Sequence, residues 1–394
     1  MAEPKIRFRR DNGSSYPAWN NKCFGDLFKK NNERNGDQFS EDRTISIASM
    51  SFNPNGNGAD ANSLSAYKVL RVGDVAFEGH ENKEFSHGRF VMNDIGDGIM
   101  SPRFSCMRPI TPMVNGFWKY YIHSEAVMRD ILIRSTKKGT MMHELVFDDF
   151  FKQSIDVPCL EEQQKIADFL SAVDEVITAS EAEVKNLETQ KKAVMKKIFS
   201  QEVRFKREDG SDFPEWEEKP FEKIASLTTA SIDPSKAGTM HCVELEHLEQ
   251  GSGQRLGYVE AENQSSNKRL FETGDVLFGK LRPYLKKYWL ATEDGCCSSE
   301  IWVLRPLSGV LSEYLLAIVS SDDFISVANT SEGTKMPRAS WDLVANAEFP
   351  VPSFEEQHFI ADFLSNFDEA IAAAKKELEL WNELKKGLLQ QMFV

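Results

Sequence analysis

The sequence predicts an α+β protein in which two similar lobes, related by a pseudo-twofold axis, are joined by two long antiparallel coiled-coil helices. Three observations predict this fold. The 394 residues contain an internal repeat, each half ends in an apolar ladder of helical period, and the rest of each half holds short aromatic and β-branched runs. A chain of this length also exceeds what one hydrophobic core usually organises, which favours two domains.

The internal repeat is strongest at the edges of the two halves. Residues 7–19 recur 197 residues later at 204–216, and residues 157–171 recur 194 residues later at 351–365. Between these edges only short motifs match. Halves that are alike at their edges and different in their middles indicate a scaffold that carries two different specificities. Drift after duplication is the alternative, but drift would not obviously spare the edges.

Residues 159–200 and 353–394 are predicted to form two long helices, each roughly 60 Å long at about 1.5 Å per residue. Apolar residues in both segments follow the 4-3-4-3 ladder of a coiled-coil seam. Ser180, Lys191 and Lys385 interrupt this ladder. The residues expected to pack in the seam are Ile166, Leu170, Val173, Ile177, Val184, Leu187, Ile360, Leu364, Phe367, Ile371, Leu378 and Trp381.

Neither helix can bury its apolar stripe alone. We expect the two helices to pack antiparallel within one chain, and homodimerisation through each helix separately is the alternative. Ser353, followed three residues later by Glu356, predicts a capping box at the start of the second helix. The first copy has Cys159 at that place, which is a poor cap.

The two lobes, residues 1–158 and 201–352, are predicted to mix short strands with a few helices. The strand candidates are rich in aromatic and β-branched residues and are bounded by Gly, Pro, Asn or Asp. The expected strands include 74–77, 103–107, 275–278 and 301–304, and residues 313–319 are expected to be helical.

Composition excludes several classes of protein. The chain has 47 Lys and Arg against 61 Asp and Glu, a net charge of −14, so bulk charge does not attract it to nucleic acid or anionic membrane. It has no 18-residue apolar run, no export signal and no disulfide framework among its six cysteines, so we expect a cytoplasmic protein. The motifs of common nucleotide-binding, metal-binding and hydrolytic sites are missing from the sequence, so we expect neither catalytic residues nor a metal site.

Basic and polar side chains nevertheless gather at corresponding places in the two lobes. Basic residues interleaved with aromatic ones suit contacts with phosphates and stacking on bases. The candidates in the first lobe are Lys83, His87, Arg89, Lys137, Lys138 and Thr140, and those in the second lobe are Lys280, Arg282, Tyr284, Lys286, Lys335 and Arg338. Arg108 and Arg305, each beside a proline at the end of a predicted strand, are expected to be structural instead.

A set of paired motifs resembles the specificity subunit (HsdS) of type I restriction-modification systems. Each half has a Gly-x-x-Phe/Tyr-Pro-x-Trp opening, a Gly-Asp-Val strand, a Gly-Thr pair before its closing strand, and a Val-Pro-x-x-Glu-Glu-Gln-x-x-Ile-Ala-Asp-Phe-Leu-Ser helix start followed by an aspartate. These motifs lie at 13–19 and 210–216, 73–75 and 274–276, 139–140 and 333–334, 157–171 and 351–365, and Asp174 and Asp368. The resemblance covers essentially the whole chain.

The resemblance implies a non-catalytic, DNA-reading subunit. Residues 1–158 and 201–352 would be two target-recognition domains, each reading one half of a bipartite, asymmetric site in double-stranded DNA. The two helices would set the spacing and dock two methylation subunits (HsdM), and through these the restriction subunits (HsdR). S-adenosylmethionine, ATP and magnesium are then expected on the partner subunits, with no cofactor in this chain and no membrane contact. A two-lobed coiled-coil scaffold that binds two proteins without reading DNA is the alternative, and a self-contained nuclease or methyltransferase is disfavoured by its missing motifs.

Overall fold

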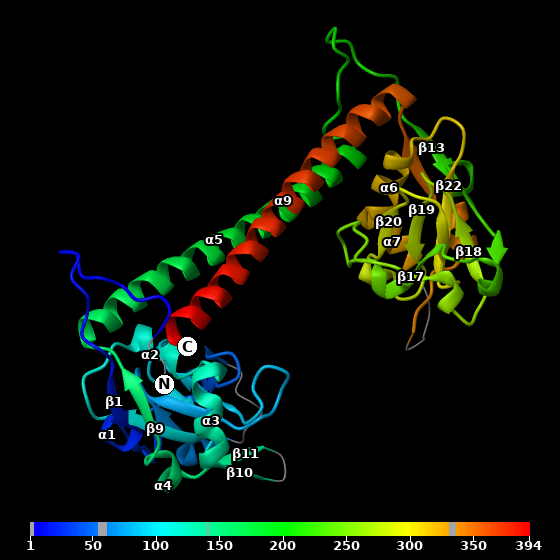
Figure 1. Ribbon diagram of the computed structural model, residues 1–394. Coiled ribbons are helices and arrows are strands. Elements are labelled where there is room, and N and C mark those ends of the chain that lie inside the picture. Colours follow the sequence, from blue (N-terminus) through cyan, green and yellow to red (C-terminus); the bar gives the residue numbers. More distant parts are fainter. Residues whose placement is uncertain (1–3, 54–60, 140–141, 331–335) are drawn as a thin grey trace. The chain divides into compact units, whose positions relative to one another are not determined.

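The computed structural model describes residues 4–53, 61–139, 142–330 and 336–394, which form two compact units (Figure 1). Unit 1 comprises the described residues of Met1–Ser180 together with Glu377–Val394, and unit 2 comprises those of Glu181–Lys376. Each unit contains one globular lobe and part of each of two 40-residue helices, α5 (Leu160–Phe199) and α9 (Phe354–Phe393).

The lobe of unit 1 is built around a four-stranded antiparallel sheet of order β2-β9-β6-β7. Its strands are β2 (Phe28–Lys30), β6 (Val75–Glu78), β7 (Arg89–Met92) and β9 (Ser105–Pro109). Four antiparallel pairs complete the strands: β1 (Asn20–Cys23) with β12 (Ser154–Val157), β3 (Ile45–Ser46) with β4 (Ser51–Phe52), β5 (Lys68–Leu70) with β8 (Gly98–Met100), and β10 (Thr136–Lys138) with β11 (His143–Leu145). The helices are α1 (Phe24–Leu27), α2 (Asn115–Tyr121), α3 (Glu125–Ser135) and α4 (Phe147–Phe150).

The lobe of unit 2 repeats this plan. Its four-stranded sheet has the order β14-β22-β19-β20, with β14 (Ala225–Leu227), β19 (Val276–Gly279), β20 (Tyr288–Leu290) and β22 (Ile301–Pro306). A five-stranded sheet has the order β15-β18-β21-β16-β17, with β15 (Ser231–Ile232), β16 (His241–Val243), β17 (Val259–Glu260), β18 (Lys268–Phe271) and β21 (Gly295–Cys297). The remaining elements are the pair β13 (Glu217–Pro220) and β23 (Glu348–Val351) and the helices α6 (Ser312–Ser320), α7 (Asp322–Ala328) and α8 (Trp341–Asn346). Helix α6 packs against β19, β20 and β22 (Figure 1).

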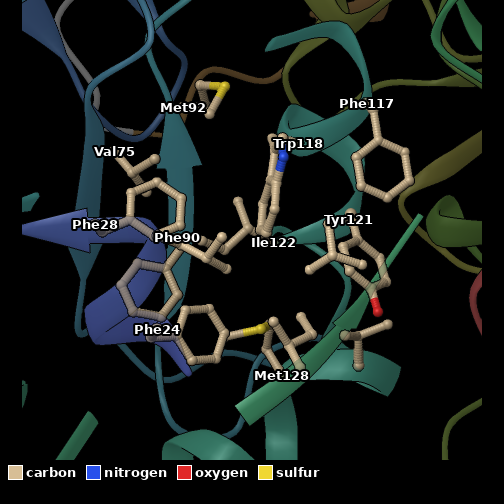
Figure 2. Close-up of a cluster of buried hydrophobic side chains, with 14 of the residues drawn as sticks. Phe24, Phe28, Val75, Phe90, Met92, Phe117, Trp118, Tyr121, Ile122 and Met128 are labelled. Carbon is tan, nitrogen blue, oxygen red and sulfur yellow. The ribbon is translucent and has the colours of Figure 1, made fainter. Parts of the chain in front are cut away.

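The core of unit 1 joins the sheet to the helices that cover it. Figure 2 shows Phe28 and Phe90, from β2 and β7, on the side of the cluster opposite Trp118 from α2. The ring centroids of Phe28 and Trp118 are 5.4 Å apart in an edge-on arrangement, which suits aromatic pairs. On the other side of α2, Phe117 and Tyr121 contact Phe393 at the end of α9. The last turn of α9 therefore closes the core of unit 1.

Within each unit the two long helices run antiparallel. In unit 2, Lys375 of α9 pairs with Glu188 of α5 at 3.0 Å, and residues earlier in α9 lie opposite residues later in α5. The two helices of one chain thus bury the apolar side chains of their seams against each other. Of the twelve residues expected in the seam, Leu187, Phe367, Leu378 and Trp381 are half-buried and the others are buried.

The two lysines that interrupt the apolar ladder form ion pairs across the helices. Lys191 donates to Asp368 in unit 2, and Lys385 lies 2.6 Å from Asp174 in unit 1. Asp174 and Asp368 are equivalent residues of the repeated helix start, and Lys385 and Lys191 are equivalent residues of the two long helices. The same ion pair therefore forms in both units. A polar pair inside an apolar seam specifies register, because slipping one helix would leave both charges without partners.

A buried glutamate fixes each long helix to the start of its repeat. In unit 1 the fully buried Glu162 accepts hydrogen bonds from Arg7 (2.8 and 3.0 Å) and from the indole nitrogen of Trp19 (3.2 Å). In unit 2 Glu356 accepts equivalent bonds from Arg204 and Trp216. The repeated edges of the sequence are therefore two halves of one Arg–Glu–Trp cluster, which we call the clasp.

The expected capping box at the start of α9 is only half correct. The hydroxyl of Ser353 accepts a hydrogen bond from the backbone nitrogen of Glu356 (3.3 Å), as a capping residue should. The carboxylate of Glu356, however, belongs to the clasp and does not return to the cap. The charged guanidinium of the half-buried Arg204 is a stronger partner for a carboxylate than a neutral backbone amide.

Within the described part of the chain, no helix is both long and apolar enough to cross a membrane.

Candidate nucleic-acid interface

In each unit, the loop that follows an inner strand of the four-stranded sheet (β6 or β19) lies beside the segment that follows a later helix (α3 or α7). In unit 1 the carbonyl of Gly79 accepts a hydrogen bond from the amide of His143 (2.7 Å). In unit 2 the carbonyl of Lys280 accepts one from the amide of Ala339 (2.9 Å). In each unit, the two segments that hold the described candidate residues, although far apart in sequence, therefore lie beside each other, and we call the side chains on them the surface of that unit.

The loop of unit 2 has a strained backbone. Arg282 and Lys286 have φ of +54° and +49°, in the left-handed region that non-glycine residues seldom adopt. They flank a short turn, Pro283–Leu285, and the amide of Arg282 donates to the carbonyl of Pro337 (2.8 Å). Strain of this kind persists where the surrounding structure holds it, and it concentrates at functional sites. The turn leaves the ring of Tyr284 about half exposed, at 48%.

Some of the cationic side chains on the surface of unit 2 form ion pairs with carboxylates, and others do not. Lys286 lies 2.6 Å from Asp322, and its hydrogen bond holds the pKa of the Asp322 carboxyl below the usual value. Arg338 pairs with Glu300 at 2.9 Å. The side chains of Lys280 and Arg282 form no ion pair among the residues that the structure describes, and Arg282 is exposed. Lys280 and Arg282 are thus available to bind an anion.

The surface of unit 1 has a different chemistry. Arg89 is held by Glu78 at 2.7 Å, and Lys138 lies 3.6 Å from Glu81. His87 accepts or donates a hydrogen bond with Ser86 and contacts the ring of His143, with the ring centroids 5.0 Å apart. Lys83 and Lys137 are exposed and form no ion pair within the described ranges. Thr140 and Lys335 lie outside the described residues.

Sequence reasoning missed a third segment that joins the surface of unit 2. The amide of Gly251 donates to the carbonyl of Lys286 (2.9 Å), so the residues around 250 lie against the strained loop. Beyond this turn, Leu256 and Tyr258 are exposed apolar side chains at 66% and 45%. The sequence around Gly251 suggests only a turn, because its partner Lys286 is 35 residues away in the chain.

Arg108 and Arg305 are structural, as expected. Arg305 binds both carboxylate oxygens of Asp275 at 2.8 Å, and Arg108 binds those of Asp74 at 2.8 and 2.7 Å. Both aspartates are buried. The aspartate of each Gly-Asp-Val motif therefore forms a bidentate ion pair with the arginine that precedes a proline at the end of the neighbouring strand. This pair holds the two strands together.

Replacing Arg305 with leucine should destabilise unit 2 by about 3 kcal/mol, because the buried side chain of Asp275 would lose its guanidinium partner. Amide hydrogen exchange resolved over the two units measures this loss. Affinity of the folded protein for nucleic acid should not change. Weaker binding at unchanged stability would instead place Arg305 in the interface.

Each half of the repeated sequence matches the model of a known protein family. The family model described as "Type I restriction modification DNA specificity domain" matches residues 17–189 and again residues 216–380, which together make up most of the chain. The chain belongs to this specificity-domain family. Each match begins close to the Pro-x-Trp of a repeated opening and continues into a long helix, so the specificity domain includes part of that helix as well as the lobe.

Several proteins with specificity domains are similar to this chain. The EcoDI specificity subunit of Escherichia coli is 28% identical over 149 residues, which cover 37% of this chain and only 33% of that subunit. The putative MjaX specificity subunit of Methanocaldococcus jannaschii is 22% identical over 384 residues, covering 92% of this chain and 87% of that protein. The crystal structure of the type I S subunit of M. genitalium superposes with a TM-score of 0.57 at 13% identity, over 100% of this chain and 99% of that one. This structure has the same fold.

Among the residues described by the structure, no cluster of three or more His, Cys, Asp or Glu side chains could hold a metal ion.

Proposed function

We propose that this chain is the DNA sequence-recognition subunit of a type I restriction-modification complex, in which each unit reads one half of a bipartite, asymmetric site. One observation carries the proposal. The two units share the order of their four-stranded sheets, the same clasp and the same buried Asp–Arg pair, yet the loops after β6 and β19 carry different side chains, with Lys83 and His87 in one and Lys280 and Arg282 in the other. A shared scaffold with unlike loops is what two different half-sites require, because sequence is read by side chains at base edges.

The proposal assigns Lys280 and Arg282 to the DNA backbone. No carboxylate of the described residues pairs with either cation, and phosphate contacts position a protein on DNA without selecting sequence. The net charge of −14 supports a model in which this chain reads the sequence and its partner subunits supply much of the electrostatic attraction to DNA.

The proposed partners follow from the repeated edges. Because both units present the same helix start and the same clasp, two identical methylation subunits could dock in equivalent ways, and restriction subunits would join through them. Methyl transfer and DNA cleavage are then carried out by these partners, which bind S-adenosylmethionine, ATP and magnesium. All six cysteines are free, which supports a reducing compartment such as the cytoplasm.

Replacing both Lys280 and Arg282 with alanine should weaken DNA binding by the complex assembled with its methylation subunit. Affinity should fall for target and non-target DNA alike. The slope of log affinity against log salt concentration should become shallower by about two, as expected when two phosphate contacts are lost. Titrations at several salt concentrations measure both quantities.

The matched control replaces the half-exposed Lys219 and the exposed Lys223, which pair with glutamates near them in sequence, and removes the same charge. This control should bind as the wild type does. An unchanged affinity and salt slope for the Lys280 and Arg282 variant would remove these residues from the interface. A wild-type complex without any affinity for DNA would favour the protein-only scaffold.

A further inference from the structure

His87, on the surface of unit 1, has the position of its ring proton fixed by two neighbours. Its Nδ1 lies 2.9 Å from the hydroxyl oxygen of Ser86. The Ser86 hydroxyl has a single proton and donates it to Oε1 of Glu125 at 2.9 Å, because a carboxylate oxygen accepts. The backbone amide of Ser86 donates to the same oxygen at 3.3 Å. The hydroxyl oxygen of Ser86 therefore accepts from His87, so Nδ1 carries the ring proton.

The other ring nitrogen of His87 is consequently a hydrogen-bond acceptor. A neutral imidazole has a proton on one nitrogen and a lone pair on the other, and the bond made by one nitrogen decides the state of the other. Among the residues that the structure describes, none bonds to Nε2 of His87, and this atom is not one of the enclosed side-chain atoms that lack a partner. A group outside the chain can therefore reach the lone pair of Nε2.

The surroundings of His87 hold it in place. Gly88, with φ of +84°, has no room for a side chain, because a Cβ there would lie 2.6 Å from the carbonyl oxygen of Glu78 on β6. The backbone beside His87 is thus packed closely against the sheet. The His87 ring also contacts His143, whose Nε2 bonds to Glu81 and whose Nδ1 is enclosed without a partner. Of these two rings, His87 is the one whose free nitrogen an external group can reach.

A fixed acceptor limits what His87 can bind on DNA. Phosphate oxygens only accept hydrogen bonds, so the neutral ring cannot bond to them through Nε2. The donors on base edges are the exocyclic amino groups, which are N6 of adenine and N4 of cytosine in the major groove and N2 of guanine in the minor groove. The corresponding loop of unit 2, residues 280–287, contains no histidine, so this acceptor distinguishes unit 1 from unit 2.

We propose that His87 is a specificity-determining residue of unit 1, and that its Nε2 accepts a hydrogen bond from the exocyclic amino group of one base. Ser86 and Glu125 are positioning residues, which act by fixing the ring proton on Nδ1. This inference rests on the proposed function, in which unit 1 reads one half of a DNA site. It adds the chemistry of one contact, because a base edge without an amino group lacks the donor that His87 requires.

Base analogues that lack only the amino group test this contact. The complex assembled with methylation subunit first selects its site from a random DNA library. Each base of that site is then replaced in turn, adenine by purine, cytosine by pyrimidin-2-one and guanine by hypoxanthine, and affinity is titrated at pH 8, where an ordinary imidazole is neutral. At one position of one half-site the replacement should weaken wild-type binding about fivefold, as expected for one hydrogen bond. His87→Ala should bind the two DNAs equally, and the analogue at that position identifies the base.

His80→Ala is the matched control, because His80 lies in the same loop, with its Nδ1 3.7 Å from Glu78. This control should keep the wild-type loss at the position that His87 reads. Ser86→Ala frees the ring proton to move to Nε2 and should reduce that loss to less than twofold. Ser86→Thr retains the hydroxyl and should preserve the loss, and discrimination at the other positions should stay unchanged in all four variants.

Three results would overturn the inference. These are a His87→Ala complex that retains every loss of the wild type, equal effects of His87→Ala and His80→Ala, and a Ser86→Ala complex that discriminates as Ser86→Thr does. A wild-type complex that selects no sequence from the library would instead reject the proposed function itself.

Discussion

Replacing Glu356 with leucine should destabilise unit 2 by about 3–5 kcal/mol, because Arg204 would lose its carboxylate partner in the clasp while staying largely buried. The indole nitrogen of Trp216 would lose its acceptor as well. Unfolding of a chain with two units need not be two-state, so hydrogen exchange at the amides of unit 2 is the appropriate measurement.

The neighbouring residue provides the control for this prediction. Glu355 is exposed, pairs with the half-exposed Arg207 at 3.1 Å, and should cost less than about 1 kcal/mol when replaced by leucine. Glu162→Leu should repeat the large effect in unit 1, where the same cluster is present. If the two unit 2 variants lose equal stability, the clasp is not what holds the helix to the lobe.

Removing one heptad from each long helix should shorten the gap between the two DNA half-sites by about three base pairs. Deleting residues 178–184 from α5 and 376–382 from α9 removes about 10 Å of helix, and about 3.4 Å separates successive base pairs. The deletion preserves the 3.5-residue period, so the apolar seam continues on the same face. Selection from a DNA library with variable gaps, using the assembled complex, measures the preferred spacing.

Two further variants distinguish a change in spacing from a loss of folding. Duplicating the same heptads should lengthen the preferred gap by about three base pairs, and deleting one heptad from α5 alone should mismatch the seam and weaken assembly. A complex that assembles, binds DNA and keeps its original gap in both the shortened and the lengthened form would refute the idea that helix length sets the spacing.

Much of the fold could be predicted from the sequence because local pattern determines it. The helices begin and end within one residue of the predicted segments 159–200 and 353–394. The expected strands at 74–77, 275–278 and 301–304 overlap β6, β19 and β22 with shifts of one or two residues at their ends. Apolar periodicity and turn residues act over a few positions, so they are visible without tertiary information.

Pairings between distant residues could not be predicted. Lys191 looked like a fault in the apolar ladder because its partner, Asp368, is 177 residues away. Glu356 looked like a cap because its arginine is 152 residues away. Among the candidate DNA contacts, the sequence indicates the positive charge of Arg89 and Arg338 but not the glutamates that neutralise it. Electrostatic availability is a tertiary property, and it separates Lys280 and Arg282 from their neighbours.

The strand pairs β1–β12 and β13–β23 give each lobe a simple boundary. In the first pair Asn20 lies opposite Val157, and in the second Glu217 lies opposite Val351, so the chain leaves each lobe beside the point where it arrived. Paired Cα atoms of this kind are about 4.5–5.5 Å apart. A lobe from another chain needs only two antiparallel ends at that separation to be grafted between the repeated supports. New specificities can therefore arise by exchanging whole lobes while the clasp, the helices and the partners stay as they are.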